Sequence, residues 1–204
     1  MFREPNISVN TPNGSRVVPM EDHLYNNRQF WLQGRITADL VDSLLTQLMI
    51  IEDDYRESGI LDKTEVEVTI YIDSPGGSLT ALNLYDYLKH TPLKVRTVVT
   101  GYAYSAAALI FLAGSERCMM PYSNLMFHEP NYACEKGIAD EPLEMVEHIT
   151  SNIKHLKDVS TGIIAEETGL TKAAIAKRIT NRKWFIDVQQ AIKLNMADKI
   201  VHRL

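Results

Sequence analysis

The sequence is poor in cysteine, which excludes a fold held together by a disulfide framework. Cys118 and Cys134 are the two cysteines among 204 residues, and neither stands in a CxxC or Cys/His spacing typical of a metal site. The six histidines add no metal-binding pattern. We therefore expect no bound metal and two free thiols in a reducing compartment.

Long apolar runs and blocks of basic charge are also missing. The longest apolar stretch, 106–114, is about half as long as a membrane span, and residues 1–18 lack the apolar core of a signal peptide. The net charge is −5, which disfavours a nucleic-acid surface. No GxxxxGK[ST] motif occurs, so the chain itself is not expected to bind ATP. These absences predict a cytoplasmic protein with no cofactor and no membrane or nucleic-acid partner.

The composition that remains is typical of a globular chain. Hydrophobic residues make up 45% and charged residues 23% of the sequence, and the length suits a single domain over residues 1–204. Residues 1–20 are polar, with Pro, Asn and Gly interleaved. This segment is predicted to be a flexible arm, or a hairpin that becomes ordered only against a partner.

Strand-like and helix-like segments alternate along the first part of the chain. Strands are predicted at 66–73 and 94–100, and helices at 36–51, 79–90 and 105–114. Thr37 is placed to cap the first helix, turns are predicted at 74–77 and 101–104, and 53–65 looks like a surface connection. The repeated order of strand, turn and helix predicts an α/β fold with a mainly parallel sheet.

A long helix is predicted after the irregular segment 131–142. Its apolar residues are Met145, Ile149, Ile153, Leu156 and Ile163. Two shorter helices, at 170–179 and 188–195, are predicted to follow it. Because the first apolar residues of the long helix lie beyond the predicted sheet, we expect them to pack against a partner.

Ser105 stands where a strand is predicted to turn into a helix. Small residues flank it, with Ala103 two positions before and Ala107 two positions after. A sharp turn that exposes a nucleophilic serine needs small neighbours, and the N–H groups of the helix start can face developing negative charge. The alternative is that Ser105 is only a helix N-cap.

The segment Ser74 to Gly77, with the sequence SPGG, follows the preceding strand. Two glycines allow the backbone to approach a ligand and to present N–H groups. In a parallel sheet the turns after neighbouring strands meet at one edge, where ligands bind. His128 ends a further predicted strand before a proline, where it could face the same cleft or lie on the surface.

Several motifs together resemble the proteolytic subunit of the Clp protease, the ClpP family of peptidases (S14). They are IYIDSPGGSLTALNLYDYL, GYAYSAAALIFLAG, NLMFHEP and AIKLNMADKIV, in this order and spacing. The similarity covers roughly 24–201, nearly the whole chain. Agreement of several separate motifs is more specific than any one of them.

The resemblance implies a crotonase-like spiral of βαβ units with a protruding handle helix, and a serine peptidase with Ser105 as nucleophile and His128 as general base. It places the oxyanion donors on the backbone N–H groups of Gly77 and Ala106. Residues of about 131–165 correspond to the handle, and the segment just after His128 to a strand that pairs with substrate.

The resemblance also implies an assembly and partners. The chain is expected to form heptameric rings stacked into a tetradecamer, alone or with a second ClpP paralogue. It is expected to cut unfolded polypeptides delivered by a AAA+ unfoldase, which hydrolyses the ATP.

The sequence departs from the family at the third member of the catalytic triad. The family has an aspartate in a T-x-R-D-x-F pattern, and residues 180–185 have Lys183 in its place. A lysine cannot accept the imidazole N–H, and loss of the acid typically costs about 10⁴-fold in kcat. Other departures are Tyr102, Ala106 with Ala107, and an insertion around 55–64, so the resemblance is that of a divergent member of the family.

Activity in the absence of this aspartate has three conceivable explanations. The Asn181 side chain could accept the imidazole N–H, an acid such as Glu129 or Asp187 could do so, or a Ser–His dyad could act slowly. The alternatives to a weakly active endopeptidase are a catalytically impaired ring subunit, a phage head-maturation protease and an acyl-CoA enzyme of the wider crotonase fold.

Overall fold

The computed structural model describes residues 5–12, 14–60, 66–130 and 143–204. The strands are β1 (Asn6–Thr11), β2 (Gly14–Pro19), β3 (Gln29–Ile36), β4 (Glu67–Gly77), β5 (Lys94–Tyr104), β6 (Glu116–Met119), β7 (Asn124–His128), β8 (Lys183–Asp187) and β9 (Lys199–Ile200). The helices are α1 (Met20–Asn26), α2 (Ala38–Glu57), α3 (Ala81–His90), α4 (Ala106–Leu112), α5 (Leu143–Thr168), α6 (Lys172–Ile179) and α7 (Val188–Lys193).

Seven strands form one mostly parallel sheet, as the α/β prediction requires. The order β3-β4-β5-β6-β9 is parallel throughout, and β7 also pairs in parallel with β5. The long strand β5 pairs with β6 along its first half and with β7 near its end. β8 joins at the edge, antiparallel to β7. The end of β5 is therefore flanked by the ends of β4 and β7.

The core lies between the sheet and its helices. β4 is buried on both faces from Val68 to Ile72, as expected for an inner parallel strand. α4 is almost wholly buried, and α2 buries one stripe containing Val41, Leu44 and Leu48. Thr37 caps α2 as predicted, because its side chain accepts a hydrogen bond from the Leu40 N–H.

Two predicted turns are strands in the structure. The 74–77 segment continues β4, because Gly76 and Gly77 pair with the end of β3. The 101–104 segment continues β5, because it pairs with Ser74 on one side and with β7 on the other. The helix predicted at 36–51 extends to Glu57, so the predicted connection at 53–65 begins as helix. Side-by-side pairing, which a single segment does not reveal, lengthened the two strands.

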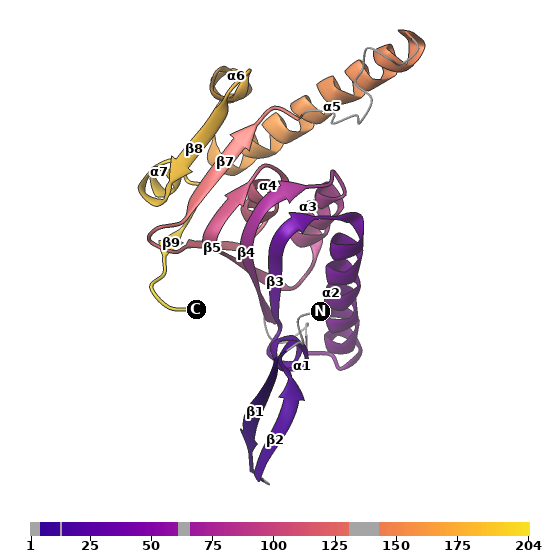
Figure 1. Ribbon diagram of the computed structural model, residues 1–204, viewed down its shortest axis with the longest axis vertical. Coiled ribbons are helices and arrows are strands. Elements are labelled where there is room, and N and C mark those ends of the chain that lie inside the picture. The colour runs from indigo at the N-terminus through magenta and orange to yellow at the C-terminus, as the bar shows by residue number, and fades with distance from the viewer. Residues whose placement is uncertain (1–4, 13, 61–65, 131–142) are drawn as a thin grey trace.

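Two elements extend away from the sheet at opposite ends of the molecule (Figure 1). β1 and β2 form an antiparallel hairpin, one of the two forms expected for residues 1–20; its flexibility remains a prediction. The long helix α5 extends from the other end, where a handle was expected, but Cys134 and the rest of 131–142 lie outside the described residues. Within the described ranges no helix has the length and hydropathy needed to cross a membrane.

Candidate active site

Ser105 occupies a strained turn between β5 and α4. Its backbone angles are φ 56° and ψ −123°, a region that residues other than glycine adopt at a cost and that is typical of functional sites. The Ser105 N–H donates to the Met126 carbonyl of β7 at 2.7 Å, which fixes the turn to the neighbouring strand. Ser105 is the N-cap residue of α4 by position, but its side chain makes no capping hydrogen bond to the helix, so the hydroxyl is not used as a cap.

Gly76 and Gly77 lie so close to other backbone that only glycine fits. A Cβ on Gly76 would stand 2.5 Å from the Tyr104 carbonyl oxygen and 2.9 Å from the Ser105 Cβ. A Cβ on Gly77 would stand 2.1 Å from the Ile36 carbonyl oxygen. The glycine segment is thus packed directly against the Ser105 turn, as expected for turns at one sheet edge.

A buried serine shapes the strand that carries these glycines. Ser74 is fully buried, and its hydroxyl donates to the Gly34 carbonyl at 2.6 Å while it accepts from the Gly76 N–H at 3.1 Å. The pairing registers of β4 shift at this point on both sides. Nothing in the sequence distinguished this role of Ser74 from that of an ordinary turn serine.

His128 ends β7, the strand beside β5. Met126 pairs with Tyr104, so the end of β7 lies next to the Ser105 turn. The imidazole Nδ1 lies 2.6 Å from the Glu129 carbonyl oxygen. Since a carbonyl oxygen can only accept, Nδ1 carries the proton in this contact, and the neutral ring then has Nε2 as its acceptor nitrogen.

All four predicted site residues line one cavity of about 110 Å³. Gly77, Ser105, Ala106 and His128 form one side of it. The other lining residues are mostly apolar: Leu79, Ala81, Leu82, Leu109, Phe127, Pro130, Leu156, Ser160 and Ile164. The cavity therefore sets a hydroxyl, an imidazole and an apolar pocket side by side, an arrangement suited to attack on a bound acyl group.

The wall contributed by α5 was not predicted. Leu156, Ser160 and Ile164 are spaced four residues apart, so one face of the helix lines the cavity. This spacing is the one sign in the sequence that could have indicated it, but an apolar helical stripe usually means core packing. The α5 wall is defined here by these three residues.

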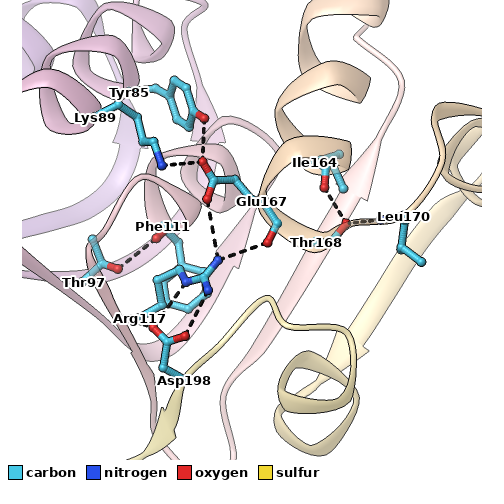
Figure 2. A network of polar contacts seen from close by, with 10 residues as sticks. All are labelled: Tyr85, Lys89, Thr97, Phe111, Arg117, Ile164, Glu167, Thr168, Leu170 and Asp198. Carbon is cyan, nitrogen blue, oxygen red and sulfur yellow. Dashed lines mark hydrogen bonds and ion pairs between the residues drawn. The ribbon is translucent and has the colours of Figure 1, made fainter.

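A polar network holds the C-terminal end of α5 against the sheet (Figure 2). The Glu167 carboxylate accepts from the Tyr85 hydroxyl at 2.9 Å and lies 2.7 Å from the Lys89 ammonium. Arg117 lies 3.8 Å from the same carboxylate and binds Asp198 at 3.0 Å. Burial and the bond to Glu167 raise the pKa of Tyr85, which keeps its hydroxyl a donor. The α5 wall is therefore fixed to α3, to β6 and to the C-terminal segment.

Lys183 lies beside His128, opposite it in the β7–β8 pair. Directly opposed residues project to the same face of a sheet, and both line a depression that adjoins the Ser105 cavity at His128 and Pro130. Lys183 is exposed. Position 183, where the resemblance implied an acid, thus lies opposite His128 and holds a cation.

The three residues considered as substitutes for that acid differ in their positions and contacts in the structure. Asp187 pairs with Asn124 at the far end of β8, about 13 Å along the strand from position 183, and its side chain accepts from the Gln190 N–H at α7. Asn181 meets Glu129 through its backbone N–H, at 3.0 Å from the carboxylate. Glu129 contacts the imidazole with its main-chain carbonyl. Asp187 is therefore too far away for this role, and the contact of the imidazole Nδ1 is with the Glu129 carbonyl and not with the Asn181 side chain.

No metal-binding group of three or more His, Cys, Asp or Glu residues occurs in the described part of the chain. Cys118 is a buried free thiol, and burial raises its pKa. The family model described as Clp protease matches residues 12–203, which include every residue of the site.

Proposed function

The chain belongs to the Clp protease family, and from this premise we propose that it is a serine endopeptidase subunit in which Ser105 attacks the substrate and His128 is the general base. As a member of this family, the chain is a ClpP-like peptidase that assembles into rings. The assignment of roles to individual residues is our proposal. It rests on the local geometry around each of them.

In the proposed acylation step, the Ser105 Oγ attacks the carbonyl carbon of the scissile amide while Nε2 of His128 takes the hydroxyl proton. The new bond is between Oγ and carbon, and the carbonyl electron pair moves to oxygen. The backbone N–H groups of Gly77 and Ala106 are the proposed donors to that oxyanion. His128 then gives its proton to the leaving amine as the carbon–nitrogen bond breaks, and water releases the acyl group by the same route.

The observation that carries the proposal is the backbone of Ser105. A non-glycine residue with φ 56° costs free energy and persists only where the surroundings impose it. Gly76 packs against the turn, the Met126 carbonyl accepts the Ser105 N–H, and the Ser105 side chain makes no capping hydrogen bond in return. A nucleophile that must project from a sharp strand-to-helix turn accounts for all three features.

The proposed substrate is an unfolded polypeptide, delivered in the cytoplasm by a AAA+ unfoldase that hydrolyses ATP. We propose stacked heptameric rings, as a tetradecamer, for the assembly. Support for α5 as the contact between rings comes from its projection away from the sheet (Figure 1) and from the exposure of Met145, which is 48% accessible.

A second candidate function is that of a catalytically impaired ring subunit that acts with an active paralogue. Lys183 favours it, because its ammonium stands where an acid would stabilise the imidazolium formed during catalysis. The two candidates differ in the reactivity of Ser105.

A serine-reactive fluorophosphonate probe, applied to the assembled protein, tests the proposal. We expect labelling that disappears in Ser105→Ala and is unchanged in Ser43→Ala, an exposed serine on α2. Turnover of a fluorogenic peptide should fall in Ser105→Ala by as much as about 10⁶-fold. An assembled wild-type protein that neither reacts nor turns over peptide would favour the impaired ring subunit, and a change in the rate of an active paralogue on mixing would identify that role.

A further inference from the structure

The imidazole of His128 is oriented without a carboxylate. In a serine triad an acid accepts the Nδ1–H and so fixes both the tautomer and the direction of the ring. Here the acceptor at 2.6 Å is the main-chain carbonyl of Glu129, while position 183 carries a lysine. The direction of that one carbonyl therefore determines where Nε2 points.

The Glu129 residue is held from two sides. Its carboxylate forms an ion pair with Lys157 of α5 and accepts the Asn181 N–H at 3.0 Å. The Lys157 ammonium and the Asn181 N–H lower the pKa of this carboxyl below its usual value, so it is charged at neutral pH. Asn181 presents its N–H from a turn with φ 54°. The carboxylate thus connects the end of β7 to α5 and to the α6–β8 turn.

The ion pair also joins the base to the substrate pocket. Lys157 follows Leu156 and precedes Ser160 on α5, and both of these line the cavity. Its ammonium additionally lies 3.4 Å from the Thr180 hydroxyl. Fixing Glu129 to Lys157 therefore sets His128 and the α5 wall in one arrangement.

We propose that Glu129 is the positioning residue for His128, with its carbonyl in place of the missing aspartate and its carboxylate, held by Lys157 and Asn181, fixing the direction of that carbonyl. This inference rests on the proposed peptidase function and concerns the same site. A neutral carbonyl orients the ring, but it stabilises the imidazolium less than a carboxylate does. With this arrangement His128 is a competent base, but a slower one than in a triad with a carboxylate.

The experiment compares four variants of the assembled protein. Glu129→Ala removes both ties and leaves the main-chain carbonyl in place. Glu129→Gln keeps an acceptor for Asn181, and Lys157→Met removes the ion pair together with the contact to the Thr180 hydroxyl. Asp158→Asn is the matched control, because Asp158 also lies on α5 and the substitution breaks its exposed 2.9 Å ion pair with Lys172 of α6. Circular dichroism and sizing chromatography establish that each variant is folded and assembled.

Two readouts separate positioning from general damage. The first is kcat and KM for a short peptide, and the second is the neutral tautomer of His128, measured by ¹⁵N NMR of histidine-labelled protein. We expect Glu129→Ala to lower kcat roughly 10- to 100-fold with little change in KM, and to convert the Nδ1–H form into a mixture. The kcat of Glu129→Gln and of Lys157→Met should fall by up to about 5-fold. Asp158→Asn should match the wild type in both readouts.

The inference and the proposed function can fail separately. If the wild type has no turnover and no reactive Ser105, the proposed function fails, and the tautomer comparison alone decides the role of Glu129. If the wild type is active, either an unchanged kcat or an unchanged tautomer in folded Glu129→Ala overturns the inference. A loss in Asp158→Asn equal to that in Glu129→Ala overturns it as well.

Discussion

The Ser105 side and the His128 side of the site are built differently. Ser105 is held by main chain, through the close approach of Gly76 and the hydrogen bond to Met126. His128 is held by the carbonyl of its neighbour, which depends on side chains at the surface; the Lys157 and Glu129 side chains are 36% and 25% accessible. Main-chain packing leaves little freedom for substitution, whereas surface ion pairs can be exchanged. We therefore expect substitutions to be tolerated beside His128 more readily than at the Ser105 turn.

The strongest test of this contrast is Gly76→Ala. The added Cβ would stand 2.5 Å from the Tyr104 carbonyl oxygen, at a residue with φ +85°, so the Ser105 turn must shift. A displacement of about 1 Å at a reacting group costs on the order of 100-fold. We expect the rate of fluorophosphonate labelling to fall by at least about that factor.

Gly59→Ala is the matched control for Gly76→Ala. Gly59 has φ +65°, and a Cβ there meets nothing within 4 Å, so it adds backbone strain of about 1 kcal/mol without a clash. It should leave the labelling rate unchanged. Labelling of folded Gly76→Ala at the wild-type rate would mean that the turn does not depend on the glycine packing.

The His128 side should instead be open to improvement. Lys183→Asp places an acid opposite His128 in the β7–β8 pair and removes the cation. We expect kcat to rise at least about 10-fold, a part of the ~10⁴-fold that the acid is worth in a serine triad. Lys183→Met is the control, because it removes the charge without adding an acceptor, and it should change kcat by less than about 3-fold. Equal rates in the two variants would show that the acid itself brings no gain.

The same contrast explains what could be predicted from the sequence. The Thr37 cap, the α/β sheet and the approach of Ser105 to Gly77 depend on local patterns and on one rule about parallel sheets, and all of these appear in the structure. The local pattern left His128 either in the cleft or on the surface, and only the family resemblance placed it in the site, where it lines the same cavity. The contact of Glu129 with Lys157 depends on how α5 packs, which no local pattern encodes. Charged residues at similar sequence distance are numerous, so the pair could not be singled out.

The errors have the same physical origin. The segments 74–77 and 101–104 contain glycines and look like turns, but strand partners on both sides make them strands. Asp187 is an acid near position 183 in the sequence, but a strand carries it away at about 3.3 Å per residue. In both cases the outcome depended on the partners of the segment and not on its own composition.

The smallest effect is expected for a substitution in the network of Figure 2. This network holds the C-terminal end of α5 and does not include His128. Glu167→Gln weakens the contacts to Lys89 and Arg117 but keeps an acceptor for the Tyr85 hydroxyl. We expect the free energy of unfolding to fall by about 1–3 kcal/mol. At fixed protein concentration this appears as a fall in Tm of roughly 2–4 °C for each kcal/mol. The control is Glu166→Gln at the exposed neighbouring position, which should not change Tm.

The kinetic result of Glu167→Gln separates the two ties of α5. The network holds the end of the helix near Ile164, so loosening it should raise KM for peptides through the α5 wall and leave kcat nearly unchanged. Lys157→Met acts at Glu129, so it should lower kcat and leave KM nearly unchanged. A kcat that falls as far in Glu167→Gln as in Lys157→Met would contradict this division, because α5 would then control the base through its whole length.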